Sequence, residues 1–209
     1  MTPIARRLAR HTLQRLAATA AVAMTLALPA QAGVLTFDEL QPGGGYQPVA
    51  NGYAQLNWSN FNVVDGNSIP NSGYSAGIVS GRNVIYNSAG DPAEISRAGG
   101  FALDSAYFTA AWYSGMTIVA RGFVDDDSNA DFISSFVVGD HAPTLVNFGW
   151  TGLSRVSFGA AQPGFGQQFA IDNLSIDGTQ AVPEPASAAL ALLGLAAALA
   201  VGARRQRRG

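Results

Sequence analysis

Residues 33–178 contain no run in which apolar residues recur with the 3.6-residue period of a helix. Instead, β-branched and aromatic residues recur in short segments that end at glycine, proline, asparagine or aspartate. Strands joined by tight turns have this pattern. The clearest case is the segment 132–138, where both faces are largely apolar or small, as expected of a central strand. The pattern predicts an all-β domain.

The expected strands are Val34–Leu40, Tyr53–Val64, Gly77–Ser80, Asn83–Tyr86, Gly100–Trp112, Met116–Val124, Asp131–Val138, Thr144–Phe148, Arg155–Phe158 and Gln168–Ile176. About ten short strands at this spacing predict a two-sheet β-sandwich of the jelly-roll type. The segment 43–51 is expected to be a loop. A single sheet or a β-helix is the weaker alternative, because the sequence has no repeat of fixed period.

The N-terminal segment, residues 1–32, has the three parts of a secretory signal peptide. Four arginines precede an apolar run over residues 16–28, and the small residues Ala30 and Ala32 then form an A-x-A cleavage site before Gly33. An amphipathic helix or a membrane anchor is the alternative, but the apolar run is shorter than the roughly 20 residues that span a bilayer. The mature chain is therefore expected to begin at Gly33.

The C-terminal segment begins with a linker over residues 179–185 and continues as an apolar run over residues 186–203. A helix of that length is roughly 27 Å long, close to the thickness of a bilayer core, so we expect a transmembrane helix. The basic tail, residues 204–209, would hold its end of the helix in the cytoplasm and leave the β-sandwich, residues 33–178, outside. The predicted fold is thus a jelly roll flanked by an N-terminal signal helix and a C-terminal transmembrane helix.

The order of these C-terminal parts resembles the PEP-CTERM sorting signal, which is also labelled the ice-binding protein C-terminal domain. The residues that carry the resemblance are Val182, Pro183, Glu184, Pro185, Arg204, Arg205, Arg207 and Arg208. The resemblance implies recognition by an exosortase, transient anchoring in the inner membrane, and delivery to the cell surface or extracellular matrix of a Gram-negative bacterium.

The charge of the middle domain excludes one class of partner. Between residues 33 and 178 stand thirteen acidic residues and four arginines, which gives a formal charge of −9, whereas the whole chain has −2. An acidic domain without a basic stripe repels phosphate backbones, so we expect no nucleic-acid binding. The chain has no cysteine, and this excludes disulfides and thiol chemistry.

The middle domain is also similar to galactose-binding-like jelly rolls of carbohydrate-binding modules. The resemblance rests on the segments 35–40, 101–108 and 169–174. In such domains an acidic residue from the first strand and one from the last can hold a structural Ca²⁺ ion. The resemblance makes Asp38 or Glu39, together with Asp172, the leading metal-site candidates; acids that cap strand ends and face solvent are the alternative.

A second acidic segment places possible calcium ligands at alternate positions, namely Asp125, Asp127, Asn129 and Asp131. It departs from the EF-hand pattern, because Ala130 stands where that loop needs glycine and Phe136 stands where it needs glutamate. A solvated hairpin turn explains the segment equally well.

Residues 73–77 match the G-x-S-x-G motif of hydrolases, with Ser75 as the nucleophile. That motif needs a strand before it, a helix after it and a base nearby, whereas here it lies in a turn rich in asparagine, serine and glycine. His141 is the only histidine between residues 33 and 178, and no pattern places it near Ser75. A turn is the better interpretation, and we expect no enzyme activity.

Exposed aromatic rings are the expected sugar contacts, and Tyr46 and Tyr74 are the candidates because both lie in predicted loops. Trp58, Trp112, Trp150, Tyr53 and Tyr113 complete the set of aromatic residues considered. The sequence therefore predicts an exported, non-enzymatic surface or matrix protein that binds or organises extracellular polysaccharide. The rival hypotheses are a purely structural or adhesion protein without a small-ligand site, and a hydrolase acting on matrix polymer.

Overall fold

The computed structural model describes residues 33–178. The predicted signal peptide, linker, transmembrane helix and basic tail lie outside the described residues. Within residues 33–178 no helix is long and apolar enough to cross a membrane.

Ten strands and four short helices make up the described part of the chain. The strands are β1 (Gly33–Leu35), β2 (Tyr46–Pro48), β3 (Asn57–Ser59), β4 (Phe61–Asp65), β5 (Asn83–Asn87), β6 (Ala93–Ala110), β7 (Met116–Phe123), β8 (Phe132–Val138), β9 (Thr144–Ala160) and β10 (Phe169–Ile176). The helices are η1 (Tyr53–Gln55), η2 (Gly66–Ser68), α2 (Gly73–Ala76) and η3 (Ser88–Gly90). The predicted all-β class is therefore confirmed.

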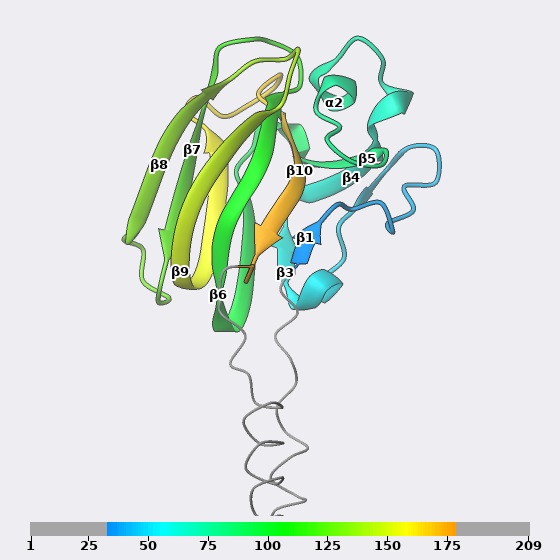
Figure 1. Cartoon of the computed structure of the whole chain (residues 1–209). Coiled ribbons are helices and arrows are strands. Elements are labelled where there is room, and N and C mark those ends of the chain that lie inside the picture. The colour runs from blue at the N-terminus through cyan, green and yellow to red at the C-terminus, as the bar shows by residue number, and fades with distance from the viewer. Residues whose placement is uncertain (1–32, 179–209) are drawn as a thin grey trace, which may run out of the picture. The chain divides into compact units, whose positions relative to one another are not determined.

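All the strand pairs are antiparallel, in the order β2-β4-β5-β10-β6-β9-β7-β8, with β1 beside β10 and β3 beside β6. The long strands β6 and β9 divide this sheet into two layers. Their segments 103–108 and 144–150 pair with each other beside β10, whereas their segments 93–96 and 155–158 pair beside β3 and β7. Figure 1 shows both strands turning at the lower end of the molecule. The result is a two-layer sandwich.

Glycines make this turn possible. Gly99 and Gly100 have φ angles of +86° and +82°, a conformation that residues with a side chain rarely adopt. The pairing register between β6 and β9 shifts at the same place, between Ser96 and Phe101. The ribbon of two strands therefore folds over on itself at this corner.

The core between the layers is aromatic. Phe108 on β6 lies with its ring centroid 5.5 Å from Phe158, 4.9 Å from Phe136 and 6.1 Å from Phe169. Phe108, Phe158 and Phe169 are fully buried. A smaller cluster, formed by Val64, Tyr74, Val84, Ala111 and Ala170, joins the segment that carries α2 to the outer face of β4, β5 and β10.

Several predicted strands differ from the observed ones. The segments 144–148 and 155–158 belong to one strand, β9, and β2 lies within the expected loop 43–51. The first expected strand stops at Leu35, since Phe37 has a φ of +62°. The segment 77–80 is not a strand, because the N–H groups of Val79 and Ser80 bind a side chain instead of a neighbouring strand.

Candidate functional site

Four loops meet at one end of the sandwich, and we call their residues 71–76, 111–114, 139–141 and 164–168 the rim. Backbone hydrogen bonds hold them together: Gly73 N donates to Ala111 O (2.8 Å), Ala111 N to Gln168 O (2.9 Å) and Ala110 N to Gly139 O (2.8 Å). The rim therefore has a fixed arrangement even though its parts are far apart in the sequence.

Aromatic side chains project from the rim. Trp112, Tyr113 and Phe165 expose 43%, 64% and 99% of their surface. The indole N–H of Trp112 donates to Oε1 of Gln168 (3.2 Å), and the ring of Tyr74 packs edge-on against the indole, with centroids 5.4 Å apart. These two contacts fix the orientation of Trp112, so that its exposed part is a preorganised apolar surface.

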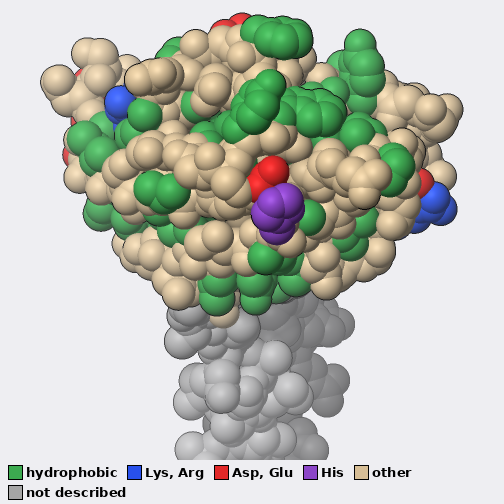
Figure 2. Space-filling view, turned by 90° about the horizontal axis from the view of Figure 1, so that it is seen from above, with side chains coloured by type: hydrophobic (Ala, Val, Ile, Leu, Met, Phe, Trp, Pro, Cys, Tyr) green, Lys and Arg blue, Asp and Glu red, His purple; other side chains and the backbone are tan. Residues whose placement is uncertain are grey.

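A pocket of about 370 Å³ lies on the same rim, lined by Asn71, Ser72, Ser75, Ala76, Asp140 and His141. The hydroxyl of Ser114, two residues after Trp112, donates to Asp140 and holds the pKa of that carboxyl below its usual range. The side chain of His141 is 90% exposed, and its Nε2 lies 3.5 Å from Oδ1 of Asp140. Figure 2, viewed onto this end, shows hydrophobic side chains gathered beside the histidine and an acidic side chain.

Ser75 and His141 line one pocket, which the sequence did not predict. However, the Ser75 hydroxyl donates to the backbone carbonyl of Ser72 (2.9 Å), and its oxygen accepts the backbone N–H of Ser72 (3.5 Å) at the start of α2. Among residues 33–178 no hydrogen bond joins Ser75 to His141. Close packing explains the first glycine of the motif, because a Cβ on Gly73 would lie 1.6 Å from the carbonyl oxygen of Ala110.

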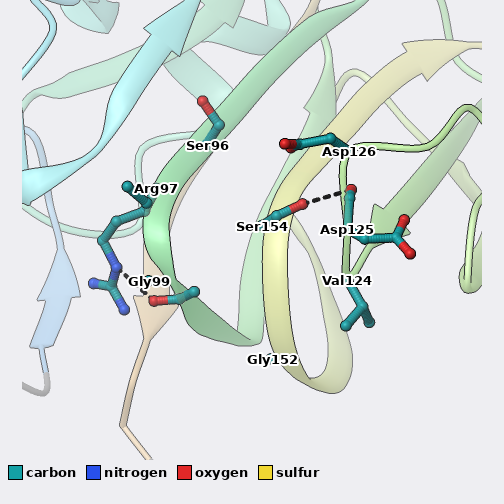
Figure 3. Close-up of a pocket in the computed structure, with 10 residues that line it drawn as sticks. Ser96, Arg97, Gly99, Val124, Asp125, Asp126, Gly152 and Ser154 are labelled. Carbon is teal, nitrogen blue, oxygen red and sulfur yellow. Dashed lines mark hydrogen bonds between the residues drawn. The ribbon is translucent and has the colours of Figure 1, made fainter.

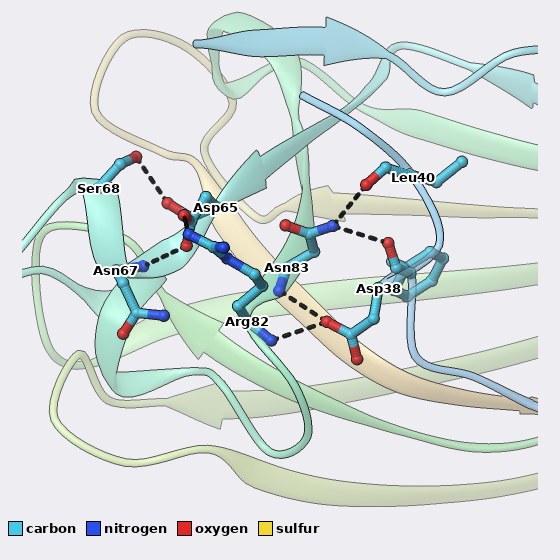
Figure 4. A network of polar contacts seen from close by, with 8 residues as sticks. Asp38, Leu40, Asp65, Asn67, Ser68, Arg82 and Asn83 are labelled. Atoms are coloured by element: carbon cyan, nitrogen blue, oxygen red, sulfur yellow. Dashed lines mark hydrogen bonds and ion pairs between the residues drawn. The ribbon is translucent and has the colours of Figure 1, made fainter. Parts of the chain in front are cut away.

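The leading metal candidates, Asp38 and Asp172, are brought to either side of one turn, residues 79–83. Oδ2 of Asp172 accepts the N–H groups of Val79 (2.7 Å) and Ser80 (3.0 Å). Oδ1 of Asp38 accepts those of Arg82 (2.7 Å) and Asn83 (3.1 Å), as Figure 4 shows. The two carboxylates thus anchor this turn from both sides.

Asp172 is fully buried, and burial raises its pKa, partly offset by the N–H groups that it accepts. Glu39 is exposed and accepts the hydroxyl of Tyr53 instead of approaching Asp172. N–H donors suit a carboxylate and repel a cation, so a Ca²⁺ ion here would compete with these hydrogen bonds. No observation tests the calcium binding that the sequence predicted for Asp38, Glu39 and Asp172, and these hydrogen bonds argue against it.

The second acidic segment forms the loop between β7 and β8. Asp125 accepts the N–H of Asp127 (3.1 Å), Asp127 accepts that of Asn129 (2.7 Å), and Asp131 accepts that of Val124 (2.7 Å). Such side-chain to backbone bonds are typical of turns. Between residues 33 and 178 no three histidine or acidic side chains gather in a group that could hold a metal ion.

The same loop borders a pocket of about 600 Å³ at the opposite end from the rim (Figure 3). Asp125 and Asp126 lie on one side of it and Arg97 on the other. Arg97 is already engaged, since its Nε donates to Gly100 O (2.8 Å) and its Nη1 lies 2.7 Å from Oδ2 of Asp177. This pocket has no aromatic lining residue.

The two predicted sugar contacts, Tyr46 and Tyr74, differ in their exposure. Tyr46 is exposed, at 67%, and lies on β2 rather than on a rim loop. Its ring packs edge-on against Tyr86, which in turn packs against Tyr74 of the rim. Tyr74 is buried, at 3%, which corrects its expected exposure: α2 lies against the outer face of the sheet, and the tyrosine fills that contact. Trp58 and Trp150 are also buried. Phe165 was missed, although a phenylalanine between two glycines and two residues after a proline signals an exposed loop.

Comparison with known proteins identifies one end of the chain. Residues 181–208 match the family model of the PEP-CTERM protein-sorting motif. This match confirms the predicted sorting signal, and it indicates an exported protein that is transiently anchored in the membrane and processed by exosortase. No curated protein matches the sequence.

Among solved structures, the chain is similar to TmCBM61 in complex with β-1,4-galactotriose (12% identity, TM-score 0.40, 70% of this chain and 98% of that chain). It is also similar to the CBM22-1 xylan-binding domain from Paenibacillus barcinonensis Xyn10C (8%, 0.39, 71% and 93%). A third is the K1 cleaved adhesin domain of Lys-gingipain from Porphyromonas gingivalis (11%, 0.42, 71% and 99%). Similarity at this level says nothing of what this chain binds, which rests on its own residues.

Proposed function

We propose that the protein is a non-enzymatic exoprotein that binds extracellular polysaccharide through the rim. The observation that carries the proposal is the meeting of exposed aromatic rings with a polar pocket. Trp112, Tyr113 and Phe165 offer apolar faces on which the C–H faces of sugar rings stack, and the pocket beside them offers groups that bind sugar hydroxyls.

The composition of the rim favours a neutral polymer. Apart from Asp140 and His141, the rim carries no Asp, Glu, Lys, Arg or His side chain. Of the four arginines in the described part of the chain, Arg82, Arg97 and Arg155 form ion pairs outside the rim. A polyanion would therefore meet Asp140 and a domain of net negative charge, whereas sugar hydroxyls can donate to the Asp140 carboxylate.

The rim is also well placed for an exposed polymer. Its loops lie at the end of the sandwich opposite the corner at Gly99 and the final residues of β10 (Figure 1). A long chain can cross this end without entering a deep cleft, so several sugar units of one polymer can be contacted. An exoprotein sorted by the C-terminal signal would in this way organise the matrix outside the cell.

The proposal is tested by the retardation of the full-length chain, in mild detergent, in gels that contain neutral polysaccharides. We expect Trp112→Ala to weaken binding about tenfold, which corresponds to ~1.4 kcal/mol. Val124→Ala is the control, because Val124 is 48% exposed, against 43% for Trp112, and lies in the loop after β7, outside the rim. Equal retardation of both variants and the unchanged protein would remove the rim from the binding site.

The rival of a purely structural protein gives a different result in the same gels. It requires that no polysaccharide, neutral or acidic, retards the unchanged protein. The hydrolase hypothesis requires that Ser75→Ala abolish polymer cleavage by the purified chain. We expect no cleavage to abolish, because the Ser75 hydroxyl already donates to a backbone carbonyl.

A further inference from the structure

The strand β8 was predicted to be a central strand, but in the structure it forms one edge of the second layer (Figure 1). It pairs with β7 on one side, and no strand among residues 33–178 pairs with its other side. Its backbone N–H and C=O groups on that side are free to pair with another strand. Soluble proteins usually protect such edges with lysine, proline, bulges or a covering loop, yet the residues Phe132–Val138 include no charged residue and no proline.

The outward face of β8 is apolar at both ends and polar at its centre. Ile133 and Val137 are 67% and 61% exposed, and Ser135 between them is exposed as well. The three side chains share one face because residues two apart in a strand point the same way. Along the strand these exposed side chains are apolar, serine and apolar. A second copy of β8 running in the opposite direction therefore presents the same order of side-chain types.

We propose that two copies of this chain pair through β8, antiparallel and about a two-fold axis at Ser135. In this register Ser135 lies opposite the partner's Ser135, and Ile133 lies opposite the partner's Val137. Directly opposed side chains in an antiparallel pair have Cβ atoms about 4.5–5.5 Å apart, so apolar residues meet apolar residues and the two hydroxyls can hydrogen-bond.

Two other registers, shifted by two residues in either direction, also keep the exposed side chains of both strands on one face. Their opposed residues match less well. A shift in one direction sets Ile133 against the partner's Ser135 and Asp131 against the partner's Val137. A shift in the other direction sets Ile133 against the partner's Gly139. One-residue shifts would place outward side chains against inward ones. Only the pairing centred on Ser135 matches every position.

In this register no direct charge repulsion arises along the paired strands. In the proposed register Asp131 lies opposite the partner's Gly139, and Asp140 lies opposite the partner's Ala130, so no acids oppose each other directly. Asp131 also lies diagonal to the end of the partner strand that leads to His141, and that histidine is strongly exposed. The overall negative charge of each domain opposes association at low salt, so the dimer should be favoured as ionic strength rises.

A pair formed in this way is closed, because each copy has used its only free β8 edge. The dimer does not depend on sugar binding. Its consequence for the matrix does: if the rim binds polysaccharide, a dimer carries two rims and can cross-link two polymer chains.

Single cysteines test the register, because the natural chain has none. In the full-length protein, Ser135→Cys should form a disulfide-linked dimer at least tenfold faster under mild oxidation than Ser59→Cys, an exposed serine on β3. Ile133→Cys and Val137→Cys should cross-link rapidly when mixed and only slowly when each is alone. Opposed strand residues meet the separation that a disulfide needs.

A rate for Ser135→Cys no greater than that for Ser59→Cys would overturn the proposal. So would rapid linkage of Ile133→Cys with itself, which indicates another register. Sedimentation of the cysteine-free chain provides the second measurement: Ser135→Lys should shift the dimer to monomer, because it sets two ammonium groups together, whereas Ser59→Lys should not. Both readouts are independent of polysaccharide, so their failure leaves the proposed sugar binding untouched.

Discussion

Replacement of Asp172 by alanine should destabilise the fold and loosen one turn in particular. The Asp172 carboxylate accepts three backbone N–H groups, from Val79, Ser80 and Asn173, at 2.7, 3.0 and 2.7 Å. The alanine variant removes both carboxylate oxygens, which accept these three N–H groups, at a fully buried position.

The magnitude follows from two opposing effects. Loss of three partly buried hydrogen bonds costs about 3 kcal/mol at roughly 1 kcal/mol each. Removal of a carboxylate whose pKa is raised by burial returns part of this, since the ionised group is itself costly to bury. We expect a net loss of about 2 kcal/mol in the free energy of unfolding. Asp172→Asn, which keeps one acceptor oxygen, should lose less.

The assay is urea unfolding of the full-length chain, followed by tryptophan fluorescence, together with amide hydrogen exchange of residues 79–83. Asp91→Ala is the control, because Asp91 is exposed, and it should change stability by less than about 0.5 kcal/mol. Exchange at Val79 and Ser80 should accelerate in Asp172→Ala more than exchange at core amides. An Asp172→Ala variant as stable as the control would refute the anchoring role.

Three other changes test the core, the rim and the calcium hypothesis. Phe108→Ala should cost about 3–5 kcal/mol of unfolding free energy in the same urea assay, because it empties the centre of the aromatic core, and a loss below 1 kcal/mol would contradict this. Ser114→Ala should raise the pKa of Asp140 toward 3.8 in an NMR titration, since it removes the main cause of the depression, and an unchanged pKa would contradict it. Calcium in place of chelator should leave the melting temperature within about 1 °C, because N–H groups already occupy the carboxylates of Asp38 and Asp172, and a rise of several degrees would show that the ion binds.

The strands that the sequence predicted best are those whose pattern is local. β7, β8 and β10 begin and end within two residues of their expected limits, because turn residues bound each of them. The corner in β6 and β9 could not be predicted from the local sequence pattern. Gly99 and Gly100 are turn signals in sequence, but here they let one strand change layer without ending it, and only pairing with a distant strand decides between the two outcomes.

The candidate site was predicted in part. The family resemblance paired acids from the two ends of the domain as metal ligands, and in the structure Asp38 and Asp172 bind the same turn. The sequence could not show that this third segment, 79–83, would offer them N–H groups. It also placed Tyr74 in a loop without knowing that this loop covers a sheet face. The rim itself joins four segments that no periodic pattern connects, so its assembly depends on the tertiary fold.

The central claim, that the rim binds neutral polysaccharide, is tested most directly by hydrogen–deuterium exchange of the full-length chain with and without the polymer that retards it in gels. Residues 111–114, 139–141 and 164–168 should become protected together, while β2 and the loop 124–131 should exchange unchanged. Protection confined to the loop 124–131 or to β2, with the rim unaffected, would contradict the account.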